Sequence, residues 1–229
     1  MSSLLPALLS SGRKILTVSE SKEVLTKYGL PFNKSVFVSV ADDIPVLCKD
    51  LLFPVVMKIV SPQIIHKTDV GGVILHLSSL DEVISAFTNL MASLKVKFPS
   101  YDLQGVLIEE EIPEGLELIA GVVNDPTFGH CLMFGIGGIF VEALNDVSFR
   151  LIPASRSDIE SMVSELRFSK LLSGLRGNSV NLDQLYVILA KLSSFSAEYA
   201  DQISEIDLNP IIATQNQLVI VDARIILKE

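Results

Sequence analysis

Residues 54–73 bring a cation, a histidine and a pair of glycines into one short stretch, and these residue types together suit phosphate chemistry. Lys58 interrupts an apolar run that predicts a buried strand, and a lysine buried there needs an anion to offset its loss of hydration. The polar loop that follows carries His66, whose neutral imidazole can accept a phosphoryl group. Gly71 and Gly72 end the loop, and without a Cβ their backbone N–H groups can approach an oxyanion. We therefore predict a phosphate-handling site in which His66 is the nucleophile.

Each of these features also has a simpler interpretation. Lys58 could extend from an edge strand into solvent, and His66 could be an ordinary residue of a surface loop. Gly71 and Gly72 could form only a turn. Their occurrence in this order within one stretch favours the phosphate-handling interpretation.

Three consecutive glutamates, Glu109, Glu110 and Glu111, end a predicted strand just before Ile112 and a break that contains proline and glycine. A strand that runs into a hinge leaves backbone N–H and C=O groups free, so the segment from Glu109 to Ile112 suits the edge of an adenine ring. Glu117, just beyond the break, could accept hydrogen bonds from ribose hydroxyls. The alternative is an acidic edge that faces only solvent.

Acidic residues near the C-terminus predict a metal site. Alternation along a strand places Glu205, Asp207 and Asn209 on one face. Asp222 lies on what we predict to be the next strand, which a short hairpin would bring alongside. Because Mg²⁺ takes one or two carboxylates together with nucleotide phosphates, Asp207, Asn209 and Asp222 are the predicted ligands. A half-exposed strand without a metal would show a similar pattern.

A glycine-rich turn, Gly135-x-Gly137-Gly138, follows another predicted strand. It matches neither the dinucleotide-binding pattern nor the Walker pattern, so a Rossmann site and a P-loop are both disfavoured. The turn could approach a second phosphate, or it could be only a bulge or tight turn. Arg150, a little further along the chain, could add a phosphate-binding cation.

The composition excludes several classes of protein. The net charge of −9 argues against a nucleic-acid binder, which would carry a basic stripe. No run of about 18 apolar residues is present to span a membrane. Cys48 and Cys131 form neither a zinc nor a redox motif, and two lone cysteines fit a reducing cytoplasm. His76 and His130, without an acid–base partner nearby in sequence, are predicted to be structural.

The hydrophobic fraction of 49% is high for a chain with 20% charged residues, which indicates apolar surface for a permanent partner subunit.

Periodicity predicts two α+β lobes. A lead-in at residues 1–17 precedes them; the first lobe covers 18–111 and carries the histidine loop, and the second covers 112–229 and carries the metal residues. Ser19 and Asp81 are predicted helix N-caps, and a cleft is predicted between the lobes. The predicted helices cover residues 20–28, 41–51, 81–94, 157–166 and 182–199, and the strands cover 35–40, 55–60, 73–77, 105–111, 116–123, 131–134, 147–152, 203–212 and 218–226.

Several long motifs resemble the beta (ATP-grasp) subunit of ADP-forming acetyl-CoA synthetase, in the family of NDP-forming acyl-CoA ligases. The resemblance covers residues 18–229. Its carriers are Ser21-Lys22-Glu23, Tyr28-Gly29-Leu30-Pro31, Lys58 through Val73, Phe134 through Glu142, and Glu205-Ile206-Asp207-Leu208-Asn209-Pro210.

The resemblance implies an ATP-grasp fold with nucleotide held between two α/β lobes. Within it, Lys58 would contact nucleotide phosphate, the segment 109–112 adenine, and Glu117 the ribose. Asn209 and Asp222 match positions that hold Mg²⁺ in related succinyl-CoA synthetases.

The resemblance also makes His66 a second phosphorylated relay, peculiar to this family. The implied reaction converts acyl-CoA, ADP and phosphate to acid, CoA and ATP, reversibly. A separate alpha subunit would bind CoA, form the acyl phosphate and pass phosphate from its own histidine to His66, and the implied assembly is an alpha2beta2 heterotetramer. Two alternatives remain: another ATP-grasp carboxylate ligase without a protein phosphohistidine, and a non-catalytic nucleotide-binding regulatory subunit.

Overall fold

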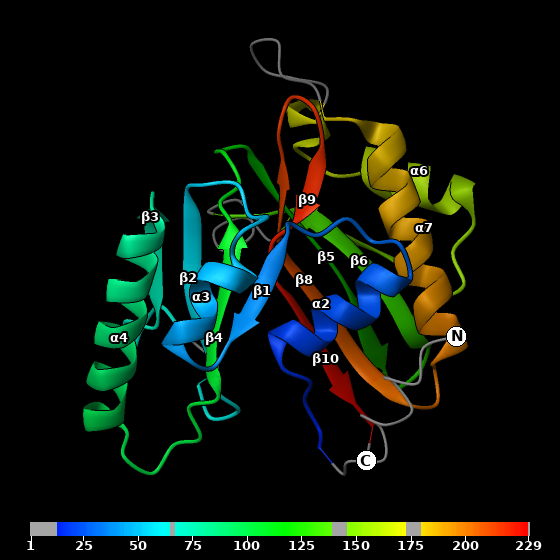
Figure 1. The fold of residues 1–229 in the computed structure, drawn as a ribbon. Coiled ribbons are helices and arrows are strands. Elements are labelled where there is room, and N and C mark those ends of the chain that lie inside the picture. The colour runs from blue at the N-terminus through cyan, green and yellow to red at the C-terminus, as the bar shows by residue number, and fades with distance from the viewer. Residues whose placement is uncertain (1–12, 65–66, 139–145, 173–179, 229) are drawn as a thin grey trace. The chain divides into compact units, whose positions relative to one another are not determined.

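The structure is a computed structural model that describes residues 13–64, 67–138, 146–172 and 180–228 (Figure 1). The chain divides into two compact units. The smaller unit is Asn33–Ile112, and the larger unit combines Met1–Phe32 with Pro113–Glu229. His66 lies outside the described residues.

The smaller unit is a four-stranded antiparallel sheet with one face covered by helix. Alternate residues of a strand point to opposite faces, so Val55, Met57 and Ile59 enter the core beside α4, and Lys58 belongs to the other face. The predicted helix 41–51 is wrong in extent, because only a 3-10 turn and a single helical turn with Pro45 near its start form there. The strand order is β1-β4-β2-β3. The elements are β1 (Ser35–Val38), η1 (Ala41–Asp43), α3 (Ile44–Leu47), β2 (Val55–Val60), β3 (Val73–Leu77), α4 (Leu80–Lys97) and β4 (Gly105–Glu110).

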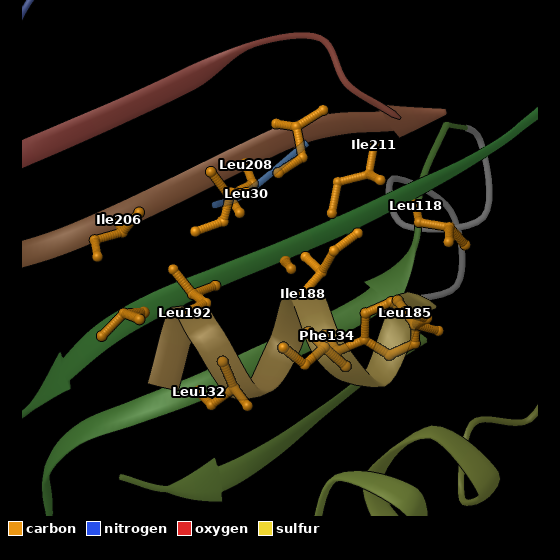
Figure 2. Packing of buried hydrophobic residues seen from close by; sticks show 14 of the residues in the cluster. Leu30, Leu118, Leu132, Phe134, Leu185, Ile188, Leu192, Ile206, Leu208 and Ile211 are labelled. Atoms are coloured by element: carbon orange, nitrogen blue, oxygen red, sulfur yellow. The ribbon is translucent and has the colours of Figure 1, made fainter. Parts of the chain in front are cut away.

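The larger unit is a six-stranded sheet in the order β10-β8-β5-β6-β7, with β9 beside β8. Figure 2 shows α7 against one face of this sheet, where Leu185 and Ile188 pack near Leu118 and Phe134 in a fully buried core. The elements are α2 (Val18–Lys27), β5 (Leu116–Asp125), β6 (Gly129–Ile136), β7 (Val147–Leu151), α6 (Arg156–Ser164), η2 (Ser169–Leu171), α7 (Leu182–Glu198), β8 (Ile203–Ala213), β9 (Leu218–Ile220) and β10 (Ala223–Leu227).

Helix α2 packs with the larger unit, whereas the sequence-based division grouped residues 18–111 together. Val24, Leu25 and Leu30 belong to the core of the larger unit, and the Ile220 N–H donates to the Pro31 carbonyl at 2.8 Å. An amphipathic helix packs in the unit whose core buries its apolar face. The order of elements along the sequence does not reveal which unit that is.

The helix starts differ slightly from the predicted ones. Thr17 rather than Ser19 caps α2, in a capping box with Glu20. Ser79 rather than Asp81 caps α4, by accepting from the Glu82 N–H. Among the described residues, no helix has both the length and the apolar character to cross a bilayer.

His130 of β6 is buried in the larger unit, with Nδ1 3.0 Å from Ser196 Oγ. Burial lowers the pKa of His130, and the positive charge of Lys228 lowers it further. The unfolded chain therefore takes up a proton near pH 6.5 that the folded chain binds less readily, and stability falls as the pH drops below that value.

We expect the wild type to lose more thermal stability between pH 7.5 and pH 5.5 than His130→Gln, which cannot titrate there. Lys228→Gln, which removes the neighbouring positive charge, should reduce the pH dependence of the wild type. Thermal unfolding followed by circular dichroism at a series of pH values tests both. Identical pH profiles for all three proteins would contradict this role for His130.

Candidate functional site

Lys58 and Glu109 form a buried ion pair on the face of the smaller sheet opposite to α4. Register pairs Lys58 with Leu107 and Val56 with Glu109, so the two charged side chains are diagonal neighbours on one face. Lys58 Nζ lies 2.6 Å from Glu109 Oε2, and their side chains are 11% and 1% exposed. The anion that a buried Lys58 requires is therefore supplied within its own unit, by one of the three predicted hinge glutamates.

The glycine pair closes the loop that follows β2. The Gly71 N–H donates to the Thr68 carbonyl at 3.0 Å, and the Gly72 N–H donates to the Lys67 carbonyl at 2.7 Å. Neither N–H is therefore left for an oxyanion in this structure, contrary to the reason for which the sequence singled them out. A Cβ on Gly72 would lie 2.4 Å from Ile59 Cγ2, so close packing on β2 requires glycine there. The predicted nucleophile, His66, belongs to the part of this loop outside the described residues.

The other hinge glutamates are held by contacts within the smaller unit. The Glu110 N–H donates to the Lys34 carbonyl and the Glu111 N–H to the Pro54 carbonyl, at 2.9 and 3.1 Å. These two N–H groups are thus not free to meet an adenine edge in this structure. The Glu111 carboxylate contacts His76, with Oε1 2.7 Å from the ring Nδ1. The sequence shows no acid–base partner close to His76 along the chain, and the structure supplies one 35 residues away, in Glu111.

In the larger unit, Glu117 and the glycine-rich turn come together. The Gly137 N–H donates to the Glu117 carbonyl at 2.7 Å. A Cβ on Gly138 would lie 3.2 Å from Glu117 Oε2, and Gly138 has a φ of +64°. The turn therefore needs glycine both for its backbone conformation and for the approach of the Glu117 side chain. Glu117 and the glycine-rich turn, which the sequence analysis treated as separate candidates, are thus in direct contact.

We expect Gly138→Ala to weaken nucleotide binding by about tenfold, because the left-handed backbone is strained and the Glu117 carboxylate must move. Calorimetric titration of the full chain with ADP measures this. Gly129→Ala is the matched control, because Gly129 also has a positive φ, of +74°, but nothing lies within 4 Å of its Cβ position. Equal loss of affinity in both variants would show that the effect is general destabilisation.

The predicted metal residues lie together in the larger unit. Ile206 and Leu208 are buried beneath α7, and Asp207 and Asn209 alternate with them onto the opposite face of β8, as predicted. Between the Leu118–Ile211 and Ala120–Leu208 pairs the register of β5 and β8 shifts by one residue, which places a bulge at Asn209. Bulges commonly re-aim side chains beside functional sites.

Asp222 is adjacent to Asn209, but it does not lie in a strand. The predicted strand 218–226 is interrupted at Val221 and Asp222, which connect β9 to β10. The Asn209 N–H donates to the Asp222 carbonyl at 3.3 Å. The prediction that Asp222 lies beside β8 therefore agrees with the structure, through a break in the strand rather than along it.

The charges around Asp207 suit a cation. Burial raises the pKa of Asp207, and although Arg224 lowers it, the carboxylates of Asp222 and Glu205 raise it further. A divalent ion would relieve this repulsion. Within the described ranges no group of three or more His, Cys, Asp or Glu side chains could hold a metal by itself.

Lys22 is a neighbour of this region that the sequence did not single out as a site residue. It is buried in α2, and its Nζ donates to the Val221 carbonyl at 3.3 Å, next to Asp222. Its ammonium also lies 5.6 Å from the centre of the Phe32 ring. A lysine among the apolar residues of an amphipathic helix was the available signal.

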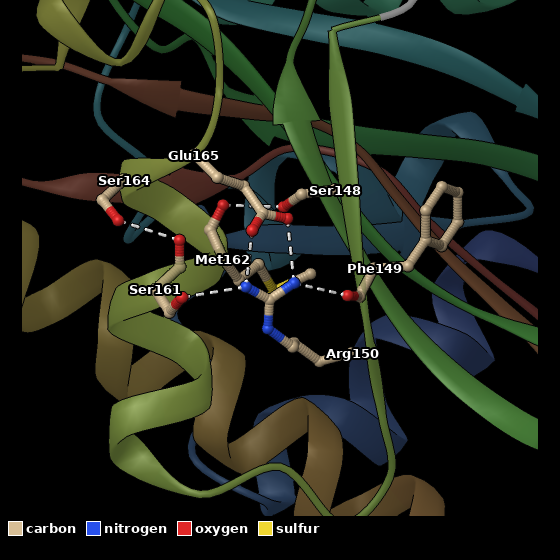
Figure 3. Close-up of polar contacts among 7 residues, drawn as sticks. All are labelled: Ser148, Phe149, Arg150, Ser161, Met162, Ser164 and Glu165. Atoms are coloured by element: carbon tan, nitrogen blue, oxygen red, sulfur yellow. Dashed lines mark hydrogen bonds and ion pairs between the residues drawn. The ribbon is translucent and has the colours of Figure 1, made fainter.

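Arg150 has a structural role, contrary to its prediction as a phosphate-binding cation. Figure 3 shows its guanidinium held by Glu165, the residue that follows α6, and by Ser161. The two guanidinium nitrogens donate to the two Glu165 carboxylate oxygens at 2.9 and 2.7 Å. Its partner in the sheet is Leu132, which faces the α7 core. Arg150 therefore lies on the face opposite to Asp207, where it ties β7 to α6.

A surface pocket of about 860 Å³ lies between α6 and the start of α7. Arg156 lines this pocket, where it forms ion pairs with Glu160 and Asp183 and stacks on the Tyr186 ring. Because the helices pack on the face of the sheet opposite to Asp207 and Asn209, this pocket is separate from the candidate site.

Comparisons with known proteins identify relatives of this chain. A family model for the ATP-grasp domain matches residues 7–227. The beta subunit of acetate–CoA ligase [ADP-forming] I from Pyrococcus furiosus is 41% identical over 93% of this chain and 91% of its own length.

Solved structures are similar over nearly the whole chain. Acetyl-coenzyme A synthetase 1 of Ca. Korarchaeum cryptofilum, in complex with coenzyme A and Ca-AMPCP, superposes with a TM-score of 0.93 at 41% identity, over 98% of both chains. A second structure of that enzyme contains coenzyme A and Mg-AMPPCP, with a phosphohistidine segment that points towards the nucleotide-binding site. It superposes with a TM-score of 0.84 at 39% identity, again over 98% of both chains.

Proposed function

Because this chain belongs to the ATP-grasp family of ADP-forming acetyl-CoA synthetase beta subunits, we propose that it is the nucleotide-binding subunit of a ligase that converts acyl-CoA, ADP and phosphate to acid, CoA and ATP. The predicted ATP-grasp fold is confirmed. The observation that carries the proposal is the gathering of Asp207, Asn209 and Asp222 in the larger unit, on the side of β8 opposite to α7.

Lys58 is the proposed phosphate contact in the smaller unit. Its side chain is pre-ordered by Glu109 at 2.6 Å, so it loses little conformational freedom when it binds an anion. Glu117, held beneath the glycine-rich turn, is the proposed ribose ligand, since its carboxylate can accept from two hydroxyl groups. The segment from Glu109 to Ile112 remains the proposed adenine contact, through groups other than the N–H groups of Glu110 and Glu111, which are bonded within the smaller unit.

Asp207, Asn209 and Asp222 would hold Mg²⁺ through hard oxygen atoms. When bound, the ion supplies positive charge that screens the nucleotide phosphates. The chain itself supplies a rigid base for these oxygens, because Asn209 and Asp222 are joined by a backbone hydrogen bond.

His66 is the proposed phosphoryl carrier. In the direction of ATP synthesis a phosphoryl group would arrive on a neutral ring nitrogen and leave to the β-phosphate oxygen of ADP, so that an N–P bond breaks and a P–O bond forms. The phosphoramidate is energetic enough to phosphorylate ADP, and Lys58 would offset the charge of the approaching phosphates. In the Korarchaeum enzyme a phosphohistidine segment points towards the nucleotide-binding site, so a phosphohistidine near the nucleotide belongs to the chemistry of that relative; a second carrier at His66 of this chain is our proposal.

A partner subunit is part of the proposal, because acyl phosphate chemistry needs a CoA site. The Pyrococcus relative is itself a beta subunit, and the Korarchaeum enzyme binds coenzyme A. Large apolar side chains are exposed on and after α3, among them Val46, Leu47, Leu52 and Phe53, which suits a surface that another chain covers. An alpha2beta2 assembly is the expected stoichiometry.

The test is a coupled assay for ATP formed from acetyl-CoA, ADP and phosphate. We expect activity when the chain is combined with its alpha subunit, and none with either subunit alone. Release of ADP from ATP and a carboxylic acid only when an amine or another acceptor is added would favour another carboxylate ligase. Nucleotide binding without turnover in the complete complex would favour a regulatory subunit.

A further inference from the structure

His76 occupies a position in β3 that favours glycine. Val55 of β2 pairs with Leu77 and Met57 pairs with Ile74, so two residues, Leu75 and His76, stand opposite one. This is a β-bulge. His76 has a φ of +59°, and it is the one non-glycine residue with a positive φ in the described part of the chain. Strained backbone of this kind persists only where surrounding contacts hold it, and it concentrates at functional sites.

The contacts that hold His76 come from Glu111. The His76 N–H donates to Glu111 Oε2 at 3.0 Å, and the ring Nδ1 lies 2.7 Å from Glu111 Oε1. Both carboxylate oxygens are therefore engaged by one residue, although the imidazole itself is 76% exposed. Glu111 contacts His76 across the start of β2, where the Glu111 N–H also donates to the Pro54 carbonyl.

We propose that His76 is a positioning residue for nucleotide binding. It clamps the Glu111 carboxylate and thereby fixes the backbone of Glu110 to Ile112, the segment proposed to meet the nucleobase. This inference rests on that proposed function and deepens it. It also changes the role of Glu111, whose carboxylate acts within the protein rather than on the ligand.

The ring is the part of His76 that a purely structural explanation does not require. Glycine would adopt the left-handed bulge without strain, and its N–H could still donate to Glu111 Oε2. Only the second bond, from Nδ1 to Oε1, needs the imidazole. That bond engages the second carboxylate oxygen of Glu111, which the backbone N–H leaves without a partner in His76.

Three substitutions at His76 separate strain from clamping. His76→Gly removes the strain and the ring, and His76→Ala removes the ring while it keeps the strain. His76→Asn tolerates positive φ and retains a side-chain N–H that can reach the carboxylate. Thermal unfolding of each full-length variant measures stability, and titration with ADP measures affinity. Turnover of the complex with the alpha subunit separates KM for ADP from kcat.

We expect His76→Gly to be at least as stable as the wild type and yet to bind ADP about tenfold more weakly. The loss should appear in KM for ADP, with kcat little changed. His76→Asn should retain most of the affinity, and Glu111→Gln should resemble His76→Gly. Leu75→Ala, at the neighbouring exposed position of the bulge, is the matched control and should bind ADP as the wild type does.

Unchanged ADP affinity in His76→Gly would overturn the inference, because the ring would then have no part in positioning. So would a loss in His76→Asn as large as that in His76→Gly. Failure of the proposed function gives a different result: the wild-type chain itself would then bind no ADP. A wild type that binds ADP, beside variants that bind it equally well, refutes only the role of His76.

Discussion

His66→Ala is expected to lower ATP formation by the complete enzyme by about 10⁴-fold or more, the scale on which loss of a covalent nucleophile acts. No other nitrogen can take over if the phosphoryl group must pass through this ring. The loop that carries His66 is anchored on both sides, by buried Ile64 and by the bond from Gly72 to Lys67. Alanine should therefore leave the rest of the loop in place. The coupled ATP assay measures the loss.

Two controls accompany this variant. His66→Ala should bind ADP and unfold at the same temperature as the wild type, since the anchoring contacts of the loop remain. Thr68→Ala, a substitution in the same loop at an exposed position, should keep most of the activity. Retention of more than a tenth of wild-type turnover by His66→Ala would be incompatible with a relay through this residue.

Lys58→Met is expected to have two separate effects. Loss of the phosphate contact should lower kcat/KM for ADP by about 10²- to 10³-fold, the usual effect of removing one preorganised electrostatic group. Loss of the ion pair with Glu109, whose atoms lie 2.6 Å apart in a buried site, should also destabilise the fold by about 3–5 kcal/mol. Enzyme kinetics and chemical denaturation measure the two effects independently.

A double variant distinguishes them. Lys58→Met combined with Glu109→Leu replaces the buried pair by apolar side chains, which is often neutral for stability. We expect this protein to recover most of the lost stability but none of the lost activity. If activity returned together with stability, Lys58 would be only a structural partner of Glu109, and the proposed phosphate contact would be wrong.

The strand face of the proposed metal residues Asp207 and Asn209 could be predicted from sequence because the signal is local. Alternation along β8 separates Asp207 and Asn209 from Ile206 and Leu208, and strand geometry alone then sets their faces. The position of Asp222 was predicted less well. Its neighbour in space is Asn209, but the break between β9 and β10 that brings them together has no signature in the sequence.

The contacts of the hinge glutamates could not be predicted, because they depend on residues distant in sequence. Glu111 meets His76 and Glu109 meets Lys58 only after β2, β3 and β4 have paired. Sequence shows that a buried lysine needs an anion, but not which of three consecutive glutamates supplies it. The placement of α2 is a similar case, since an amphipathic helix shows which face is buried but not which core buries it.

The most direct test of the relay is label transfer from γ-labelled ATP in the presence of Mg²⁺. The wild-type chain and His66→Ala are compared, each with and without the alpha subunit. We expect acid-labile, base-stable phosphate on the wild-type chain and none on His66→Ala. Label that reaches only the alpha subunit, in equal amount with either protein, would contradict it and would indicate a ligase with a single phosphohistidine, on the partner.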